Sequence, residues 1–305
     1  MTGYRRWSAP LFALLLGAWA GLAAASEVHP VKHGEGRLWR IERGDTPPSH
    51  IIGTVHVTDP RVRDLPAPIR EAFENSEQAA FEMRMTPEEI EAMMARLGSP
   101  ERSRPLTKLL DRATFDRLAA LVAPYGLDRD RLNQLHPFAV MYLLSAPPEE
   151  HQRQASGDLV LDAWLIQWAY DLGLRVEGLE TLDEHFGFID QVPLKDHATM
   201  LRETVAELEK DPDHFERLII DYLDGDLSRF FAEMEAEARK DPGARAFKEA
   251  ILDQRNHQMV ERAIPLLARG KAFIAVGAAH LPGMIASHRP ARRACWPCWN
   301  AAATQ

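Results

Sequence analysis

The sequence predicts an α/β (α+β) protein with a mixed β-sheet core and a long helical insertion. Three observations support this prediction. Short apolar runs typical of strands lie towards both ends of the chain, near residues 38–56 and 272–277. The apolar residues between these two regions mostly follow helical spacing. The run Ala272–Val276 has no polar interruption, which is typical of a strand buried on both faces.

The first strands are expected in a hairpin. Leu38–Glu42 alternates as a half-buried strand does, and Arg43–Pro48 contains the Gly, Asp and Pro residues that favour a turn. Ile51-Ile52 then begins a second short strand, which runs into Gly53–His56. Two short strands across a polar turn predict a hairpin, and its second strand places His56 at a strand end.

A strand between two helices is expected next. Ala79–Met83 is a short apolar run that holds one carboxylate, and an amphipathic helix is expected before it, near Pro68–Ser76. Thr86–Glu89 then begins another helix. This segment combines a threonine cap, a proline at the first helical position and a glutamate that closes a capping box.

The rest of the chain is mainly helical. Apolar spacing predicts helices over 105–144, where Pro137 starts or kinks a turn, and a strong helix over Asp162–Leu172. Leu174–Glu180 returns to a strand pattern. Residues 192–268 are helical again, with breaks expected at Asp211-Pro212, Gly225 and Asp241–Gly243.

The N-terminal residues are typical of an export signal. Arg5 and Arg6 precede the apolar run Leu11–Leu22, and Ala23–Ala25 offers small residues to a signal peptidase. The apolar run is too short to span a bilayer, so we expect cleavage after residues 1–25. An uncleaved N-terminal anchor is the alternative. After cleavage no stable membrane span is expected, and the protein would be periplasmic or secreted.

The charge balance argues against a nucleic-acid partner. Without residues 1–25 the chain has 34 basic and 45 acidic side chains, a formal charge of −11, whereas nucleic acid requires a basic face. The remaining length suits one large domain, and no linker or repeat divides it. We therefore expect one domain over 26–283, followed by an atypical segment at 284–305.

Two Gly-x-x-His motifs carry the strongest chemical signal. In both Ile51–His56 and Ala275–His280, an apolar run leads to Gly, two small or β-branched residues and His. Glycine permits a tight approach where a strand turns away, and a histidine at that exit points into the crevice outside the sheet. One copy alone is most simply a strand-end histidine with a local hydrogen bond. Two copies predict half-sites that converge on one metal pocket.

Several blocks of the sequence follow one another in a recognisable order. They are Gly53–His56 with Leu65-Pro66 and Ala72-Phe73, then Phe81-Glu82, Asp162 with Gly178–Thr181, Arg255-Asn256 with Met259, and Val276–Gly283. From about residue 37 to 283 these blocks resemble the TraB/PrgY/GumN family. That family is related to the TIKI metalloproteases and more distantly to ChaN-like and erythromycin-esterase-like proteins.

The resemblance implies a TIKI/ChaN-like fold and a divalent-metal-dependent site formed by His56, Glu82 and His280. Manganese or cobalt is favoured by the resemblance, and zinc is also compatible. The residue types agree, because two imidazoles and one carboxylate can hold an ion and leave positions open for water. Glu82 acts either as a ligand or as a general base, and a solvent-exposed carboxylate is the alternative. Gly53 and Gly277 belong to the cofactor-binding part of the site.

Two further residues are assigned to the catalytic set. Glu180 at a strand exit is expected to orient a ligand histidine or to join the metal. Arg255 suits a substrate carboxylate or a developing oxyanion, with a structural salt bridge between the two residues as the alternative. Asp162 is interpreted as a helix N-terminal residue that interacts with the helix dipole. His136 is expected at the core or its boundary. The other histidines set aside, for lack of ligand spacing, are His151, His185, His197, His214 and His257.

The C-terminal segment departs from the family pattern. Family members continue after the second motif with a helix and a last strand, whereas Met284–Gln305 shows neither period. Cys295 and Cys298 lie in this segment without the context of a redox pair or a zinc site. We hypothesise a frameshifted or divergent tail that exposes an edge of the sheet and puts the activity of this chain in question.

Together these observations predict an enzyme, an extracytoplasmic metal-dependent hydrolase. By resemblance it would be a peptidase that acts on a secreted or periplasmic peptide or protein. Two alternatives stay open: a non-catalytic protein that sequesters a peptide, and a haem- or metal-binding protein.

Overall fold

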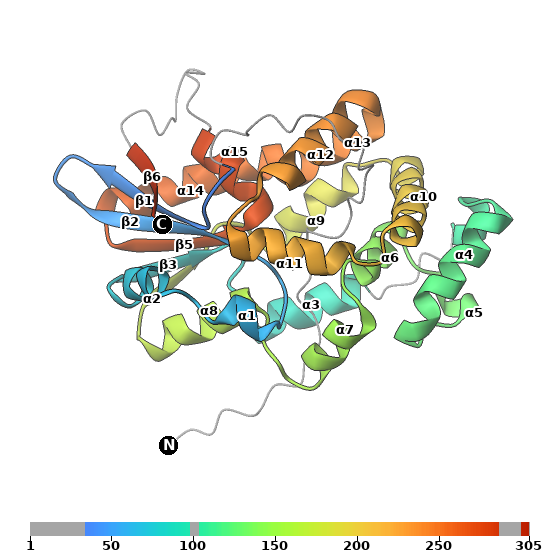
Figure 1. Ribbon diagram of the computed structural model, residues 1–305, viewed down its shortest axis with the longest axis horizontal. Coiled ribbons are helices and arrows are strands. Elements are labelled where there is room, and N and C mark those ends of the chain that lie inside the picture. The colour runs from blue at the N-terminus through green and yellow to red at the C-terminus, as the bar shows by residue number, and fades with distance from the viewer. Residues whose placement is uncertain (1–33, 98–103, 287–299, 305) are drawn as a thin grey trace.

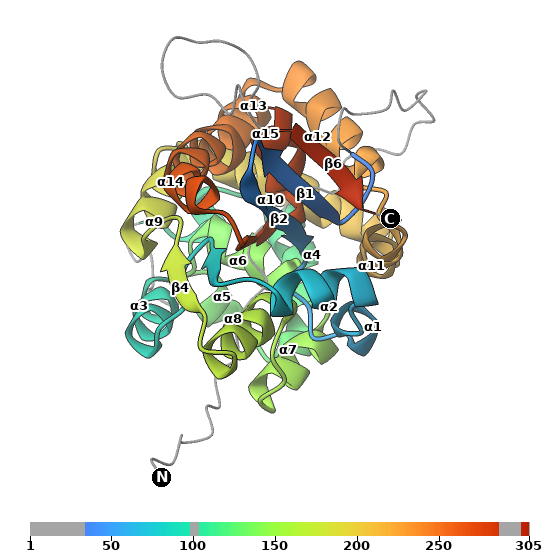
Figure 2. The ribbon, with the colours of Figure 1, turned by 90° about the vertical axis from the view of Figure 1, so that its left-hand side faces the viewer.

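A six-stranded mixed sheet forms the centre of the protein, in the order β4-β3-β5-β2-β1-β6 (Figure 2). The computed structural model describes residues 34–97, 104–286 and 300–304. The predicted α/β class with a mixed sheet is therefore confirmed. The strands are β1 (Leu38–Arg43), β2 (Thr46–Thr54), β3 (Gln78–Phe81), β4 (Arg175–Gly178), β5 (Ala272–Gly277) and β6 (Asn300–Thr304).

The predicted hairpin is confirmed, but its turn is shorter than expected. Strands β1 and β2 pair antiparallel, and the pairing extends to Arg43 opposite Thr46. Pro47 and Pro48 therefore lie inside β2 rather than in the turn. They are tolerated there because the pairing of β2 with β5 begins only at His50, so the missing prolyl N–H groups cost no bond to β5.

Four neighbouring strands, β4, β3, β5 and β2, run parallel. Every residue of β5 is buried, as its unbroken apolar sequence predicts. Because the four strands are parallel, their carboxyl ends meet at one edge of the sheet. The chain passes from β2 to β3 and leaves a place between them that β5 later fills. Crevices at such changes of strand order are where α/β proteins commonly bind ligands.

Helices cover both faces of the sheet and extend beyond its carboxyl edge. Figure 2 shows α14 on one side of the strands and α8 on the other; α14 contacts β2 and β5, and α8 contacts β3 and β4. In Figure 1 the β1–β2 turn lies at the left-hand end, and α4, α5, α6 and α10 lie at the right-hand end.

The helices between β3 and β5 form the predicted insertion, and those around 192–268 break where the sequence predicts. Thr86 and Glu89 form the reciprocal capping bonds expected at the start of α3. The helices are α1 (Pro60–Arg63), α2 (Ala67–Glu74), α3 (Pro87–Leu97), η1 (Leu106–Lys108), α4 (Arg112–Val122), η2 (Ala123–Tyr125), α5 (Arg129–Leu132), α6 (Pro137–Leu144), α7 (Pro148–Ala155), α8 (Leu161–Asp171), α9 (Leu182–Asp190), α10 (Leu194–Lys210), α11 (His214–Asp224), α12 (Ser228–Lys240), α13 (Pro242–Lys248), the π-helix η3 (Glu249–Gln254), α14 (Arg255–Arg269), η4 (Ala278–His280) and α15 (Leu281–Ala286).

The C-terminal segment corrects the prediction that it holds neither helix nor strand. Helix α15 directly follows the second motif, and β6 pairs antiparallel with β1, with Leu38 opposite Thr304. An edge of the sheet was expected to be exposed, whereas β6 covers the edge at β1. The outer edge of a strand offers backbone N–H and C=O groups to any extended segment, whatever the side-chain period of that segment. Cys295 and Cys298 lie outside the described residues.

No helix in the described part of the chain is both long enough and apolar enough to cross a membrane. The predicted signal segment, residues 1–25, lies outside the described residues.

Candidate active site

Each of the four parallel strands delivers one predicted site residue just beyond its carboxyl end. His56 follows β2, Glu82 follows β3, Glu180 follows β4, and His280 follows β5 in the short helix η4. All four are buried, with exposed fractions of 9%, 9%, 4% and 0% respectively. Arg255, at the start of α14, is 1% exposed and lies among them. The structure thus brings all five charged or imidazole side chains of the predicted set together.

The two motif glycines let the half-sites meet. A Cβ atom on Gly53 would lie 3.0 Å from the Cα atom of Ala278, so the first motif packs against the second. A Cβ atom on Gly277 would lie 3.0 Å from Glu82 Oε1, 3.6 Å from His56 Nε2 and 3.7 Å from His280 Cδ2. Three candidate ligand groups therefore converge on Gly277, where any side chain would intrude.

The first half-site is built on a histidine–carboxylate pair. His56 Nδ1 lies 2.7 Å from Asp162 Oδ2, and the Thr54 hydroxyl donates to Asp162 Oδ1 at 2.5 Å. The Tyr222 hydroxyl donates to the carbonyl of Gly53 at 2.9 Å and holds the motif from α11. Burial lowers the pKa of His56, but the charge of Asp162, its hydrogen bond and Glu82 together raise that pKa above its ordinary value. With Nδ1 held by Asp162, the Nε2 atom of His56 lies on the side of Gly277.

The second half-site has a neutral partner in the same position. His280 Nδ1 lies 2.8 Å from Asn256 Oδ1, and His280 Nε2 lies 3.0 Å from Arg255 Nη1. Because the guanidinium can only donate, His280 Nε2 is the acceptor and Nδ1 carries the proton. Burial, followed by the charge of Arg255, lowers the pKa of His280 to about 3.

Arg255 uses all five of its N–H groups inside the protein. Nε donates to Glu180 at 2.9 Å, Nη1 donates to His280 and to the carbonyl of Ile251, and Nη2 donates to Glu180 and Glu82 at 2.5 Å each. Burial lowers the pKa of Arg255, but Glu180 and Glu82 raise it further, so the charge is retained. No donor is left for a substrate. Of the two roles that the sequence left open, the structure shows the salt bridge.

Glu82 links the two half-sites. Its Oε1 accepts the N–H of Gly277 at 2.6 Å and lies 3.8 Å from His280 Nε2. Burial raises the pKa of Glu82, but His280, Arg255 and His56 together hold it well below its usual range. The alternative of a carboxylate in solvent therefore does not apply.

Glu180 binds a histidine that the sequence set aside. His185 is 1% exposed, and its Nδ1 lies 2.8 Å from Glu180 Oε1, whereas its buried Nε2 has no hydrogen-bond partner. Burial raises the pKa of Glu180, but Arg255 and His185 lower it to about 2. His197 is also buried, in the helical layer, with its ring 5.0 Å from that of His136.

The donor set fits a divalent cation. Glu82, Glu180 and His185 offer ligand atoms that lie within 4.8 Å of one another, so this group alone can hold a metal ion. However, Arg255 already donates to both oxygens of Glu180. Arg255 also donates to Glu82 and to His280 Nε2, so an ion bound in this centre would compete with the guanidinium for these ligand atoms. Glu82 and Glu180 share the single guanidinium of Arg255, so these two carboxylates carry a net negative charge that a bound cation would offset.

Three side chains of the centre were missed or given another role by the sequence. Asp162 lies in the first turn of α8, as predicted, but its carboxylate also holds His56. Asn256 holds His280, and His185 holds Glu180. Asp162 and Asn256 belong to the blocks that carry the family resemblance, and that is the one sequence signal for them. His185 gave none.

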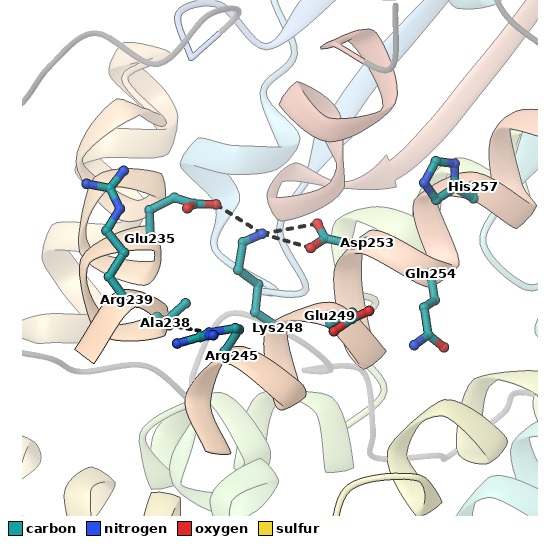
Figure 3. Close-up of a pocket in the computed structure, with 9 residues that line it drawn as sticks. All are labelled: Glu235, Ala238, Arg239, Arg245, Lys248, Glu249, Asp253, Gln254 and His257. Carbon is teal, nitrogen blue, oxygen red and sulfur yellow. Dashed lines mark hydrogen bonds and ion pairs between the residues drawn. The ribbon is translucent and has the colours of Figure 1, made fainter. Parts of the chain in front are cut away.

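A separate pocket of about 520 Å³ is lined by residues of α12, α13, η3 and α14 (Figure 3). Lys248 Nζ lies 3.0 Å from Glu235 Oε1 and 2.9 Å from Asp253 Oδ2, and His257 also lines the pocket. None of the predicted site residues lines this pocket. Its charged groups largely neutralise one another, so it does not compete with the centre at the strand ends.

The fold and the centre define an α/β protein with a buried histidine–carboxylate site at the carboxyl edge of its sheet. The sequence model of the TraB/PrgY/gumN family matches residues 37–286, and the chain belongs to this family. Comparisons with curated proteins and with solved structures gave no match.

Proposed function

We propose that the protein is an extracytoplasmic metal-dependent hydrolase that cleaves a peptide substrate. One observation carries the proposal: His56, Glu82 and His280 converge on Gly277. Each imidazole is fixed at Nδ1 by a side chain from a helix. His56 Nε2 lies towards Gly277, whereas His280 Nε2 accepts a hydrogen bond from Arg255 that a bound ion would replace. Metal-binding histidines are commonly oriented by hydrogen bonds of this kind.

His56, Glu82 and His280 would hold the ion, which would be manganese, cobalt or zinc. When bound, such an ion polarises a carbonyl group and lowers the pKa of its water. Burial and the Arg255 charge keep His280 neutral, as a metal ligand requires. Arg255 fixes Glu82 and Glu180 without contacting substrate.

The remaining parts of the proposal rest on the sequence. The basic and apolar residues of segment 1–25 favour export, and the TIKI resemblance favours a peptide over other hydrolysable substrates. Within the site, Glu82 has a second role open to it. If the two imidazoles suffice for the ion, its carboxylate can accept a proton from the attacking water.

Elemental analysis combined with a peptide-cleavage assay tests the proposal. The purified protein is expected to carry a divalent ion and to cleave peptides from a mixed library, and chelation should abolish the cleavage. His56→Ala, His280→Ala and the double variant should lose both metal and cleavage while the far-ultraviolet circular dichroism stays unchanged. His257→Ala is the control, because His257 lies on the same helix as Asn256 but is exposed.

Cleavage retained by both single variants would overturn the proposal. Protection of a peptide without turnover would instead support a sequestering protein. A visible absorption band on haem titration would support a haem-binding protein.

A further inference from the structure

The loop that carries His56 is held at two places. On one side, α8 holds it through Asp162 and through the Leu161 N–H, which donates to the carbonyl of Val57 at 3.2 Å. On the other side, α7 holds it through Glu150, which contacts Thr58, two residues after His56. The Asp162 contact belongs to the site described above, whereas the Glu150 contact lies outside it.

Glu150 is fully buried, at 0% exposed, and its carboxylate accepts four hydrogen bonds. Oε1 accepts from the N–H of Thr58 at 2.8 Å and from Gln154 Nε2 at 2.9 Å. Oε2 accepts from the Thr58 hydroxyl at 2.9 Å and from Arg153. Arg153 Nε also donates to the Thr58 hydroxyl at 2.8 Å, which closes the network.

Burying the Glu150 carboxylate carries a desolvation penalty that an apolar side chain would not have. Removing a charge from water costs several kcal/mol, and apolar residues of similar volume often stabilise a protein as well or better. What the carboxylate adds is direction, because it binds both the N–H and the hydroxyl of one threonine. Together with the Asp162 bond, this contact fixes the short backbone segment on which His56 stands.

We propose that Glu150 is a positioning residue for His56. By holding Thr58, it keeps His56 Nδ1 against Asp162 and thereby keeps Nε2 towards Gly277. It also ties the helical insertion, through α7, to the catalytic edge of the sheet. The expected loss of metal affinity on removal of Glu150 rests on the proposed function. The expected change in the His56 imidazole does not.

The test compares Glu150→Gln with Glu149→Gln in the full chain, because Glu149 is the exposed neighbour on the same helix. The imidazole nitrogens of His56 are assigned by ¹⁵N NMR in chelator-treated protein, with His56→Gln used for assignment. At a pH above the folded pKa of His56, the unaltered protein and Glu149→Gln should show one neutral imidazole form, with the proton fixed on Nδ1. Glu150→Gln should show a mixture of tautomers or a weakened Nδ1–H hydrogen bond. Thr58→Val should show the same change.

A second readout is the affinity for manganese, measured by calorimetry. Glu150→Gln should bind the ion about tenfold more weakly per folded molecule, the lower end of what indirect ligand positioning contributes. A fall in thermal stability with an unchanged His56 imidazole signal in both Glu150→Gln and Thr58→Val would overturn the proposal, because it would show a purely structural role. If no variant and no unaltered protein binds metal, the proposed function fails, and the imidazole signal still decides the role of Glu150.

Discussion

The two Gly-x-x-His motifs share a sequence pattern, a strand-end position and a common neighbour in Gly277, yet their histidines differ electrostatically. His56 faces the carboxylate of Asp162, and its pKa is raised. His280 faces the amide of Asn256 and the guanidinium of Arg255, and burial, followed by the Arg255 charge, lowers its pKa to about 3. Burial lowers the pKa of both imidazoles, and the carboxylate that α8 places beside His56 reverses this effect there.

This difference suits a division of labour. A histidine kept neutral in a buried site can bind a cation without first losing a proton, although at His280 the ion would replace the Arg255 hydrogen bond at Nε2. A histidine beside a carboxylate is a better base and can hold or release a proton. The site thus combines one imidazole that is neutral by burial with one that is basic through its partner.

Loss of Arg255 should have the largest effect, because it removes the buried cation that pairs with Glu82 and Glu180 and that adds to the lowering of the His280 pKa. Arg255→Met would leave Glu82 and Glu180 buried without their charge partner. Breaking a buried pair in this way costs about 3–5 kcal/mol. We expect the free energy of unfolding in urea to fall by about that amount.

Arg262→Met is the matched control for Arg255→Met. Arg262 lies on the same helix and pairs with Glu184, but 39% of its side chain is exposed. Such pairs contribute about 1 kcal/mol or less. Equal losses in the two variants would mean that the buried network contributes no more than an exposed ion pair.

Gly277→Ala tests whether the two half-sites depend on the shared glycine. The backbone of Gly277 has φ −51°, which alanine adopts readily, so any cost comes from contact with Glu82. Glu82 is held by Arg255 and cannot move aside freely. We expect a loss of about 1–3 kcal/mol, typical of overpacking, together with weaker metal binding.

The control for Gly277→Ala is Gly187→Ala, where a Cβ atom meets nothing within 4 Å. Gly187 lies inside α9, so alanine should stabilise the protein by about 0.5–1 kcal/mol. If Gly277→Ala changed neither the free energy of unfolding nor the metal affinity, His56, Glu82 and His280 would not be packed tightly around Gly277.

The sequence was sufficient to predict strands β1 to β5, the hairpin and the helix breaks, because these follow from local periodicity and turn chemistry. It also placed His56, Glu180 and His280 at strand ends, and the family resemblance added Glu82, which the sequence put inside a strand. It did not predict the partners that tune them. Asp162 follows His56 by 106 positions and Glu150 follows Thr58 by 92, and no local pattern records which helix start will face which strand end. The short strand β6 was missed for a similar reason, since its pairing depends on the free edge of β1.

Exchanging the Nδ1 partners of the two histidines, Asp162 and Asn256, should shift their pKa values in opposite directions. Asp162→Asn removes the carboxylate that raises the pKa of His56, so that pKa should fall. Asn256→Asp places a carboxylate on His280 Nδ1, so the pKa of His280 should rise. Histidine titrations by NMR in metal-free protein check both directions. Metal affinity should fall about 10-fold or somewhat more in Asp162→Asn, as for other groups that orient a ligand.

Unchanged pKa values in both variants would show that burial alone sets the protonation of the motif histidines. A change confined to Asp162→Asn would show that Arg255 dominates at His280 whatever its second partner is.

The smallest effect concerns the pH dependence of stability, where the two motifs should act with opposite signs. His280 has a folded pKa of about 3 against an ordinary 6.5, so the unfolded chain binds the extra proton and stability falls as pH drops from about 6.5 towards 3. His56 has a raised pKa, so its contribution is complete below 6.5 and is lost as pH rises through the folded value. Each group changes the slope by at most about 1.4 kcal/mol per pH unit.

Urea unfolding at several pH values, with chelator present, separates the two contributions. Between pH 5 and 6.5 the lowered pKa values of Glu82 and Glu180 add little, because both carboxylates have ordinary values of 4.5. His280→Gln should therefore make the free energy of unfolding depend less on pH between pH 5 and 6.5. His56→Gln should reduce the pH dependence above pH 6.5 instead. If both variants flatten the same window, the two imidazoles titrate alike, and the protonation difference between the half-sites does not exist in solution.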